Sequence, residues 1–169
     1  MQFLVNSMAK NMTDLSIKNT ELINSVLESE GVVYSLIKGI SMRPMLKQGR
    51  DIVVIEPVIP DDFKVNDCLL YKRPNYDFLP LHRVLRIDGD TLIIRGDNTY
   101  SLEYVPKSYV VGKLKAFYRK GKYYDCETSK VYKTYVVLNR LFYPFRSFWF
   151  KKLRPFLYKI YCMIFKRNK

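Results

Sequence analysis

The chain has 169 residues, 48% of them apolar, and it carries 29 Lys and Arg side chains against 16 Asp and Glu. This length suits one compact domain with an appendage, and the apolar content excludes a wholly disordered chain. Three cysteines and a single histidine give no disulfide framework and exclude a histidine-rich zinc site. We therefore expect neither a metal nor a cofactor.

The first segment, residues 1–31, is predicted to be helical. Met1–Lys10 has neither a basic region nor a long apolar run, so we do not expect a signal peptide there. From Asp14 to Glu30 apolar residues recur at helical spacing, and Gly31 is a plausible stop. These residues are Leu15, Leu22, Ile23, Val26 and Leu27. The pattern predicts an amphipathic helix.

Residues 32–126 are predicted to form a β domain, because short β-branched or aromatic runs alternate there with turn residues. Asp88-Gly89-Asp90 predicts a tight hairpin, since Gly supplies the positive φ that such turns need. The predicted strands are Val32–Ile37, Asp51–Val58, Cys68–Lys72, Leu81–Ile87, Thr91–Arg95 and Tyr109–Tyr118. Because no helices intervene, we expect a mainly β fold: a small coiled antiparallel barrel or sandwich.

The tail, residues 127–169, holds nearly all of the excess positive charge. Residues 130–169 contain 11 basic and no acidic side chains, together with 12 of the 25 aromatic residues. Cations interrupt every stretch of about 20 residues that could span a bilayer, so we expect short in-plane helices, broken at Pro144 and Pro155. The rings would lie at the acyl boundary and the cations at anionic headgroups. The alternative is that part of the tail packs on the β domain as ordinary core.

Three short segments of the β domain carry residues that could do chemistry together. Ser41 lies in Gly39–Leu46, His82 lies on a predicted strand, and Asp97 follows the next strand in Arg95-Gly96-Asp97-Asn98. A serine hydroxyl becomes a good nucleophile when neutral imidazole accepts its proton, and a carboxylate on the far ring nitrogen fixes the tautomer. Spacing alone leaves open the structural alternatives: a turn hydroxyl, a strand histidine and a turn aspartate.

Taken in order, Gly39–Asp51, Leu81–Val84 and Gly96–Asn98 resemble the signature boxes of the signal peptidase I superfamily, which also includes the self-cleaving SOS-type repressors. The resemblance covers roughly Ser35 to Lys115. Where bacterial leader peptidases have a lysine base, this chain has His82-Arg83-Val84, similar to the serine–histidine branch of endoplasmic-reticulum and archaeal signal peptidases.

The resemblance implies that Ser41 is the nucleophile, His82 the base and Asp97 the residue that orients it. The oxyanion and substrate positions would lie along the serine box, with Gly39 where many leader peptidases have a hydroxyl residue, so the oxyanion would rest mainly on the Ser41 N–H. The contributing residues would be Gly39, Ile40, Met42 and Pro44. Substrate would be a leader or signal peptide lying extended along an exposed strand.

The expected function is thus a serine endopeptidase that is peripherally membrane-associated through residues 130–169. We expect no membrane anchor before Ser41, which leaves the side of the membrane open and favours the cytoplasmic face. One alternative is a dedicated cytoplasmic leader peptidase for a peptide natural product. Another is a non-catalytic regulator that binds membrane or nucleic acid. Nucleic acid is disfavoured, because residues 1–31 hold one clear helix, too little for a helix-turn-helix.

Overall fold

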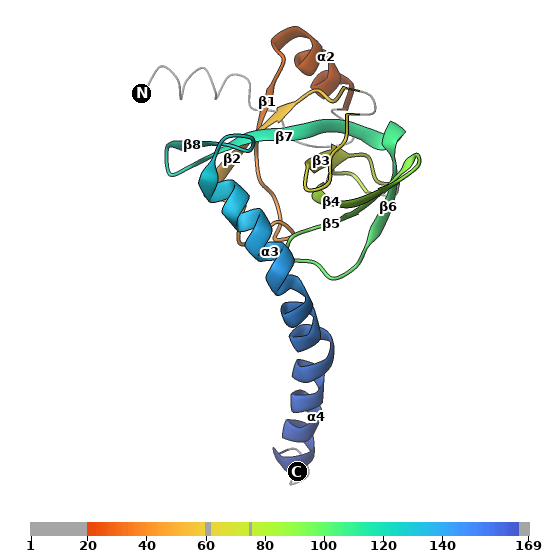
Figure 1. Ribbon diagram of the computed structural model, residues 1–169, viewed down its shortest axis with the longest axis vertical. Helices are drawn as coiled ribbons and strands as arrows, with labels where there is room; N and C mark the ends of the chain where they lie inside the picture. The colour runs from red at the N-terminus through yellow and green to blue at the C-terminus, as the bar shows by residue number, and fades with distance from the viewer. Residues whose placement is uncertain (1–19, 60–61, 75, 166–169) are drawn as a thin grey trace. The chain divides into compact units, whose positions relative to one another are not determined.

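The computed structural model describes residues 20–59, 62–74 and 76–165 (Figure 1). The chain divides into two compact units, residues 1–133 and 134–169. The first unit contains helix α2, eight strands and the first turn of helix α3, and the second contains the rest of α3 and helix α4. All eight strands fall within the predicted range 32–126.

The first unit is built on one antiparallel sheet of eight strands, which confirms the mainly β prediction. The path across the sheet is β1-β2-β7-β3-β4-β5-β6, and β8 pairs with β7. The strands are β1 (Val33–Leu36), β2 (Asp51–Glu56), β3 (Cys68–Tyr71), β4 (Leu81–Asp88), β5 (Thr91–Arg95), β6 (Glu103–Pro106), β7 (Val110–Arg119) and β8 (Lys122–Asp125). Of these, β6 and β8 lie outside the predicted strands.

Turn chemistry sets the hairpins of this sheet. Asp88 pairs with Thr91 across the two-residue turn from β4 to β5, where Gly89 has φ of 54°, as predicted. Lys120 and Gly121 both have positive φ in the turn from β7 to β8. The turn residues thus fix which strands are neighbours.

The sheet buries a core on one side of β3, β4, β5 and β6. Its fully or nearly fully buried members are Leu69, Tyr71, Val84, Leu92, Ile94 and Val105. Strand β3 is buried at all four positions, and it pairs with β4 at one edge and with β7 at the other. The core therefore holds β3 and β4 rigidly, and β4 carries the only histidine of the chain.

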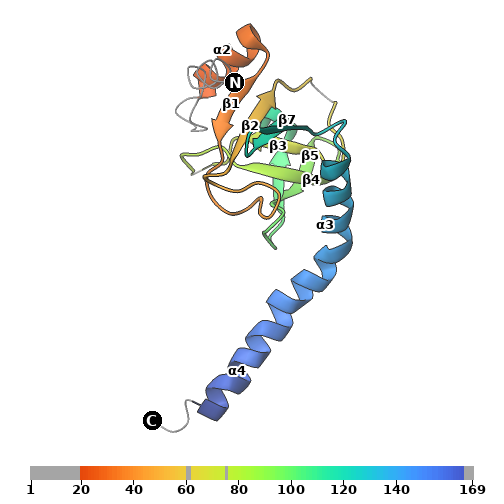
Figure 2. The same cartoon turned by 90° about the vertical axis from the view of Figure 1, so that its left-hand side faces the viewer.

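Helix α2 (Thr20–Glu30) lies beside β1 (Figure 2). Ile23 and Leu27, one helical turn apart, are buried, whereas Leu22 is exposed. Leu27 approaches β7 at Gly112, where the strand has no side chain. The prediction of an amphipathic helix is confirmed for this part, and Leu15 and the rest of residues 14–19 lie outside the described residues.

In the C-terminal segment, α3 (Lys130–Phe148) contains Pro144, so the predicted break at this proline is wrong. Pro144 is exposed, and water can satisfy the helix carbonyl that its missing N–H leaves unpaired. A π-helical turn (η3, Trp149–Leu153) joins α3 to α4 (Arg154–Phe165). There the Arg154 N–H donates to the Trp149 carbonyl, five residues back, directly before Pro155, which has no N–H to offer.

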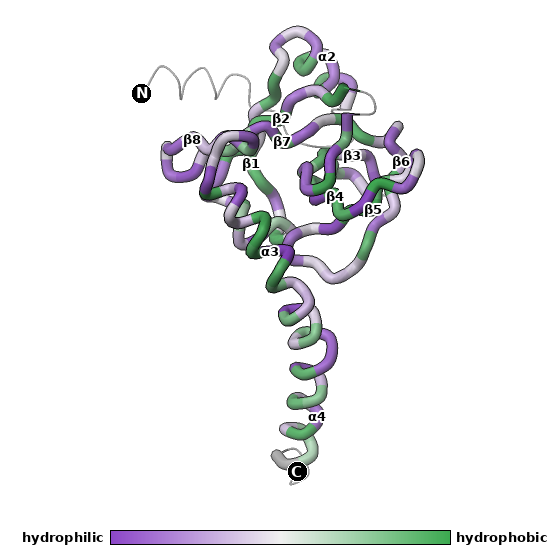
Figure 3. The backbone as a smooth tube through the Cα atoms, viewed as in Figure 1, coloured by the Kyte–Doolittle hydropathy of each residue, from purple (hydrophilic) through white to green (hydrophobic). Residues whose placement is uncertain are grey.

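Apolar and polar residues interleave along α3 and α4 (Figure 3). Large apolar side chains there are exposed, among them Phe145 at 74%, Phe148 at 62% and Tyr158 at 61%. Among the described residues, no helix combines the length and apolar character needed to cross a membrane.

Candidate functional site

Ser41 and His82 meet at Gly96. A Cβ atom placed on Gly96 would lie 3.0 Å from the Ser41 Cβ and 3.1 Å from the His82 Nε2, so both groups lie within 3.1 Å of one point. The Asn98 N–H donates to the Ser41 carbonyl over 2.6 Å, and the Asn98 side-chain amide donates to the Ile40 carbonyl over 3.2 Å. All three segments predicted from the sequence therefore come together, and the glycine is needed for close approach.

Ser41 lies in the loop that follows β1. Met42 and Met45, in the same loop, have buried side chains that anchor it to the core. Gly39 has φ of 83°, and its N–H donates to the Gln48 side chain. The Ser41 N–H is without an acceptor among the described residues.

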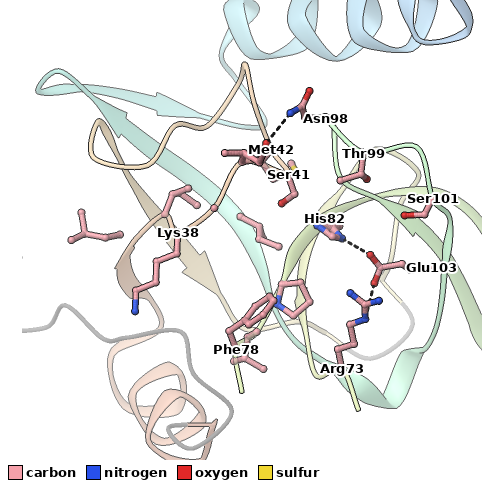
Figure 4. A pocket seen from close by; sticks show the side chains of 17 residues that line it. Lys38, Ser41, Met42, Arg73, Phe78, His82, Asn98, Thr99, Ser101 and Glu103 are labelled. Carbon is pink, nitrogen blue, oxygen red and sulfur yellow. Dashed lines mark hydrogen bonds and ion pairs between the residues drawn. The ribbon is translucent and has the colours of Figure 1, made fainter. Parts of the chain in front are cut away.

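Strand pairing fixes His82. It lies opposite Leu69 on β3 and is 5% exposed. Its Nδ1 lies 3.2 Å from the Glu103 Oε1 (Figure 4). The same nitrogen lies 2.9 Å from the Tyr71 hydroxyl, which donates to the Glu103 Oε2 over 2.7 Å. Because Tyr71 gives its one proton to the carboxylate, both neighbours of Nδ1 are acceptors. The network therefore assigns the proton to Nδ1 and leaves a lone pair on Nε2, the nitrogen that lies near Ser41 at Gly96.

The charges of this network favour an ionised Glu103. The hydrogen bond from His82, followed by the one from Tyr71 and the charges of His82 and Arg73, lowers the pKa of Glu103 against the opposing effect of burial. The Arg73 Nε lies 3.6 Å from the Glu103 Oε2. Burial and the hydrogen bond to Glu103 raise the pKa of Tyr71, so the phenol stays protonated. A fixed negative charge thus faces the far nitrogen of the histidine.

The carboxylate beside His82 is therefore that of Glu103, and the prediction that Asp97 orients the ring needs correction. Arg83 binds Asp97 in a bidentate pair, with Nε to Oδ1 at 2.8 Å and Nη2 to Oδ2 at 2.7 Å. Arg83 also donates to the Asn66 carbonyl and to the Tyr132 hydroxyl. Both members of the pair are buried, and this burial commits Asp97 to the neighbouring arginine on β4.

Sequence reasoning missed Glu103, Tyr71 and Arg73. Glu103 opens β6, a four-residue strand that was not predicted, and Tyr71 is the last residue of β3. The signal in the sequence was an acidic residue at the start of the short run Glu103-Tyr104-Val105.

A pocket of about 410 Å³ opens over Ser41 and His82. Gly39, Ile40 and Met42 line it as expected, whereas Pro44 is exposed and lies outside its lining. One side of the pocket is polar and contains Asn98, Thr99, Ser101, Glu103 and Arg73, and the rest of the lining is mainly apolar but includes Lys38 (Figure 4). The apolar lining residues are Leu36, Ile37, Ile40, Phe78, Leu79 and Leu81. The lining thus combines a serine and a histidine with a polar and an apolar part.

The three cysteines and the possible metal ligands lie outside this arrangement. Burial raises the pKa of the Cys68 thiol to about 12, and Cys68, Cys126 and Cys162 are all unpaired. Within the described ranges, no group of three His, Cys, Asp or Glu side chains is arranged to hold a metal ion.

Compared with models of protein families, the chain matches none. A comparison with curated protein sequences also finds no match.

Proposed function

We propose that the protein is a serine endopeptidase in which Ser41 is the nucleophile, His82 the general base and Glu103 the residue that orients His82. The observation that carries the proposal is the convergence of Ser41 and the free Nε2 of His82 at Gly96, with a carboxylate on the opposite ring nitrogen. A nucleophile, a base and an orienting acid in one pocket are the parts that acyl transfer requires.

In the proposed reaction, the Ser41 Oγ attacks the scissile carbonyl carbon while Nε2 of His82 takes the hydroxyl proton. The carbonyl oxygen becomes an oxyanion, which the Ser41 N–H stabilises. When the C–N bond breaks, the imidazolium gives its proton to the leaving amine, and Ser41 holds the acyl group as an ester. Water then attacks the ester with His82 again as the base. Glu103 stabilises the imidazolium in both steps.

The proposed substrate is a leader or signal peptide. The serine, histidine and glycine-turn segments resemble the boxes of the signal peptidase I superfamily, and the proposed fold is that family's small coiled β-barrel. The proposal also includes peripheral attachment to anionic membrane through residues 130–169, with the cytoplasmic face favoured. The supporting observation is the exposure of large aromatic side chains among the cations of α3 and α4.

The experiment is cleavage of a library of leader peptides by purified protein in the presence of lipid vesicles, with new N-termini read by mass spectrometry. Ser41→Ala tests the nucleophile. Ser101→Ala is the matched control, because Ser101 lines the same pocket but is not at Gly96. We expect wild type and Ser101→Ala to cut at the same positions and Ser41→Ala to make no cuts.

Cuts that persist at the wild-type rate in Ser41→Ala would overturn the proposed mechanism. The breadth of the set of cleaved peptides separates a general signal peptidase from a dedicated leader peptidase.

A further inference from the structure

A second pocket of about 700 Å³ lies between strand β6 and the segment that follows β3. Its lining includes all of Leu102 to Pro106 on one side and Lys72, Arg73 and Tyr76 on the other. Successive side chains of a strand point to opposite faces of its sheet. A pocket lined by five consecutive residues therefore runs along the edge of β6 and not over one face.

Among the described residues, no strand occupies the outer edge of β6. β6 ends the path of strands, and its partner among the described residues is β5 alone. An exposed strand edge presents backbone N–H and C=O groups to which an extended peptide can pair. The geometry therefore suits a peptide in strand conformation.

The side chains around this edge determine which charge a bound peptide should carry. Lys72 is exposed and makes no ion pair with any described residue. Arg73 lies across the Tyr76 ring at 4.1 Å. The acidic lining residue, Glu103, is already bonded to Tyr71 and His82. Arg73 is paired with Glu103 at 3.6 Å, so the exposed Lys72 is the lining cation that favours a segment with its own carboxylates.

Aromatic rings flank the same edge and are left exposed. Tyr76 is 40% exposed, Tyr104 67% and Tyr109 38%, and all three line the second pocket. Tyrosine gives a large contact area at a low cost in conformational entropy. The exposed rings can therefore cover the side chains of a bound strand.

We propose that the second pocket is a binding site for an extended acidic peptide segment, which adds to β6 as a further strand. Arg73 and Glu103 line both this pocket and the pocket over Ser41, so the two adjoin. A single chain can thus engage both. The bound segment would be part of the substrate, at a distance from the scissile bond, and this assignment rests on the proposed function. The binding of an acidic peptide to the second pocket does not depend on the proposed function.

The test is fluorescence anisotropy with three labelled peptides of about ten residues. The first alternates Glu with Thr and Val, the second has Lys in place of Glu, and the third keeps Glu but has Pro in place of Val. Full-length Ser41→Ala protein is used, so that cleavage does not enter the measurement. The variants are Lys72→Glu and Tyr104→Ala, and the matched control is Lys122→Glu, which makes the same charge change at an exposed site on β8.

At about 0.15 M salt we expect the acidic peptide to bind at least about tenfold more tightly than the basic and the proline-containing peptides. Lys72→Glu and Tyr104→Ala are each expected to weaken binding about tenfold, and Lys122→Glu less than twofold. Equal losses in Lys72→Glu and Lys122→Glu would show general attraction to a basic chain and would overturn the site. Equal binding of the proline peptide would overturn strand addition. Neither result bears on cleavage by Ser41, which the peptide library tests separately.

Discussion

At the scale of single residues, the hydrogen bonds at Nδ1 of His82 decide what the ring can do. The Tyr71 hydroxyl donates to Glu103, so the network places the proton on Nδ1 and leaves Nε2 as the nitrogen that would act as the proposed base. Glu103 and not Asp97 therefore holds the tautomer. The two carboxylates differ in their partners, because Glu103 bonds to Tyr71 and His82 whereas Asp97 bonds to Arg83, and substitution can separate their proposed roles.

Glu103→Gln tests the tautomer. A glutamine can offer an N–H to Nδ1, which favours the opposite tautomer and removes the charge that stabilises the imidazolium. We expect kcat/KM for a cleaved leader peptide to fall by about 10²-fold or more while the urea midpoint stays within the range of a surface substitution. Glu56→Gln, on β2 and outside the pocket, is the control. A glutamine variant with wild-type kcat/KM would remove Glu103 from the proposed mechanism.

Asp97→Ala tests the structural role of the buried pair. Arg83 would keep its charge in a site where its side chain is 4% exposed. Removing one partner of a buried ion pair costs about 3–5 kcal/mol, because the other charge is left uncompensated. We expect the free energy of unfolding, measured by urea denaturation, to fall by that amount. Asp88→Ala breaks the exposed pair with Arg86 and is expected to cost less than about 1 kcal/mol. Equal losses in the two variants would contradict this role.

At the scale of elements, the loop that contains Gly96 packs directly against the loop that contains Ser41. A Cβ on Gly96 would lie 2.8 Å from the Ser41 carbonyl oxygen, closer than real contacts allow. Gly96→Ala must therefore push Ser41 and His82 apart, and we expect kcat/KM to fall at least about tenfold. Gly89→Ala is the control, because Gly89 has φ of 54° but open space around its Cβ position. It should lose about 1 kcal/mol of stability and keep its activity.

The sequence predicted the longer strands because their β-branched runs are bounded by turn residues. It did not predict β6, because Glu103–Pro106 has four residues, one of them proline, and its stability comes from pairing with β5 and from burying Val105. From the three sequence segments we predicted that Ser41, His82 and the Gly96 turn lie close together, and in the structure they do. The carboxylate was assigned wrongly because Asp97 is close in sequence to the turn, whereas strand pairing brings Glu103 to the ring.

In the C-terminal helical segment, the positions of the prolines alone did not predict where the helices end. Pro144 was expected to end a helix, yet α3 continues through it, because a single lost hydrogen bond on an exposed helix is tolerated. Near Pro155 the α-helix is interrupted as expected, because the π-helical turn Trp149–Leu153 lies directly before α4, whose second residue is Pro155. Each proline removes one backbone N–H from the helical hydrogen bonds, but this loss alone does not determine whether the helix ends.

At the scale of the whole molecule, charge is divided along the chain. Residues 1–129 carry 18 basic and 16 acidic side chains, whereas residues 130–169 carry 11 basic and none acidic. A cationic segment attracts any anionic surface and loses that attraction in salt. Aromatic side chains that enter the acyl boundary add a contribution that salt does not screen. The two contributions can therefore be measured separately.

Phe145→Ser with Trp149→Ser tests the aromatic contribution, since both rings are exposed and neither substitution changes the charge. In a vesicle co-sedimentation assay, we expect wild type to bind phosphatidylserine-containing vesicles at low salt and to keep part of this binding at about 0.5 M salt. The double variant should bind at low salt and release at high salt. Ile59→Ser, at an apolar position that is 70% exposed in the first unit, should behave as wild type. If wild type itself releases completely in high salt, the rings do not enter the lipid, and the attraction of the tail is electrostatic alone.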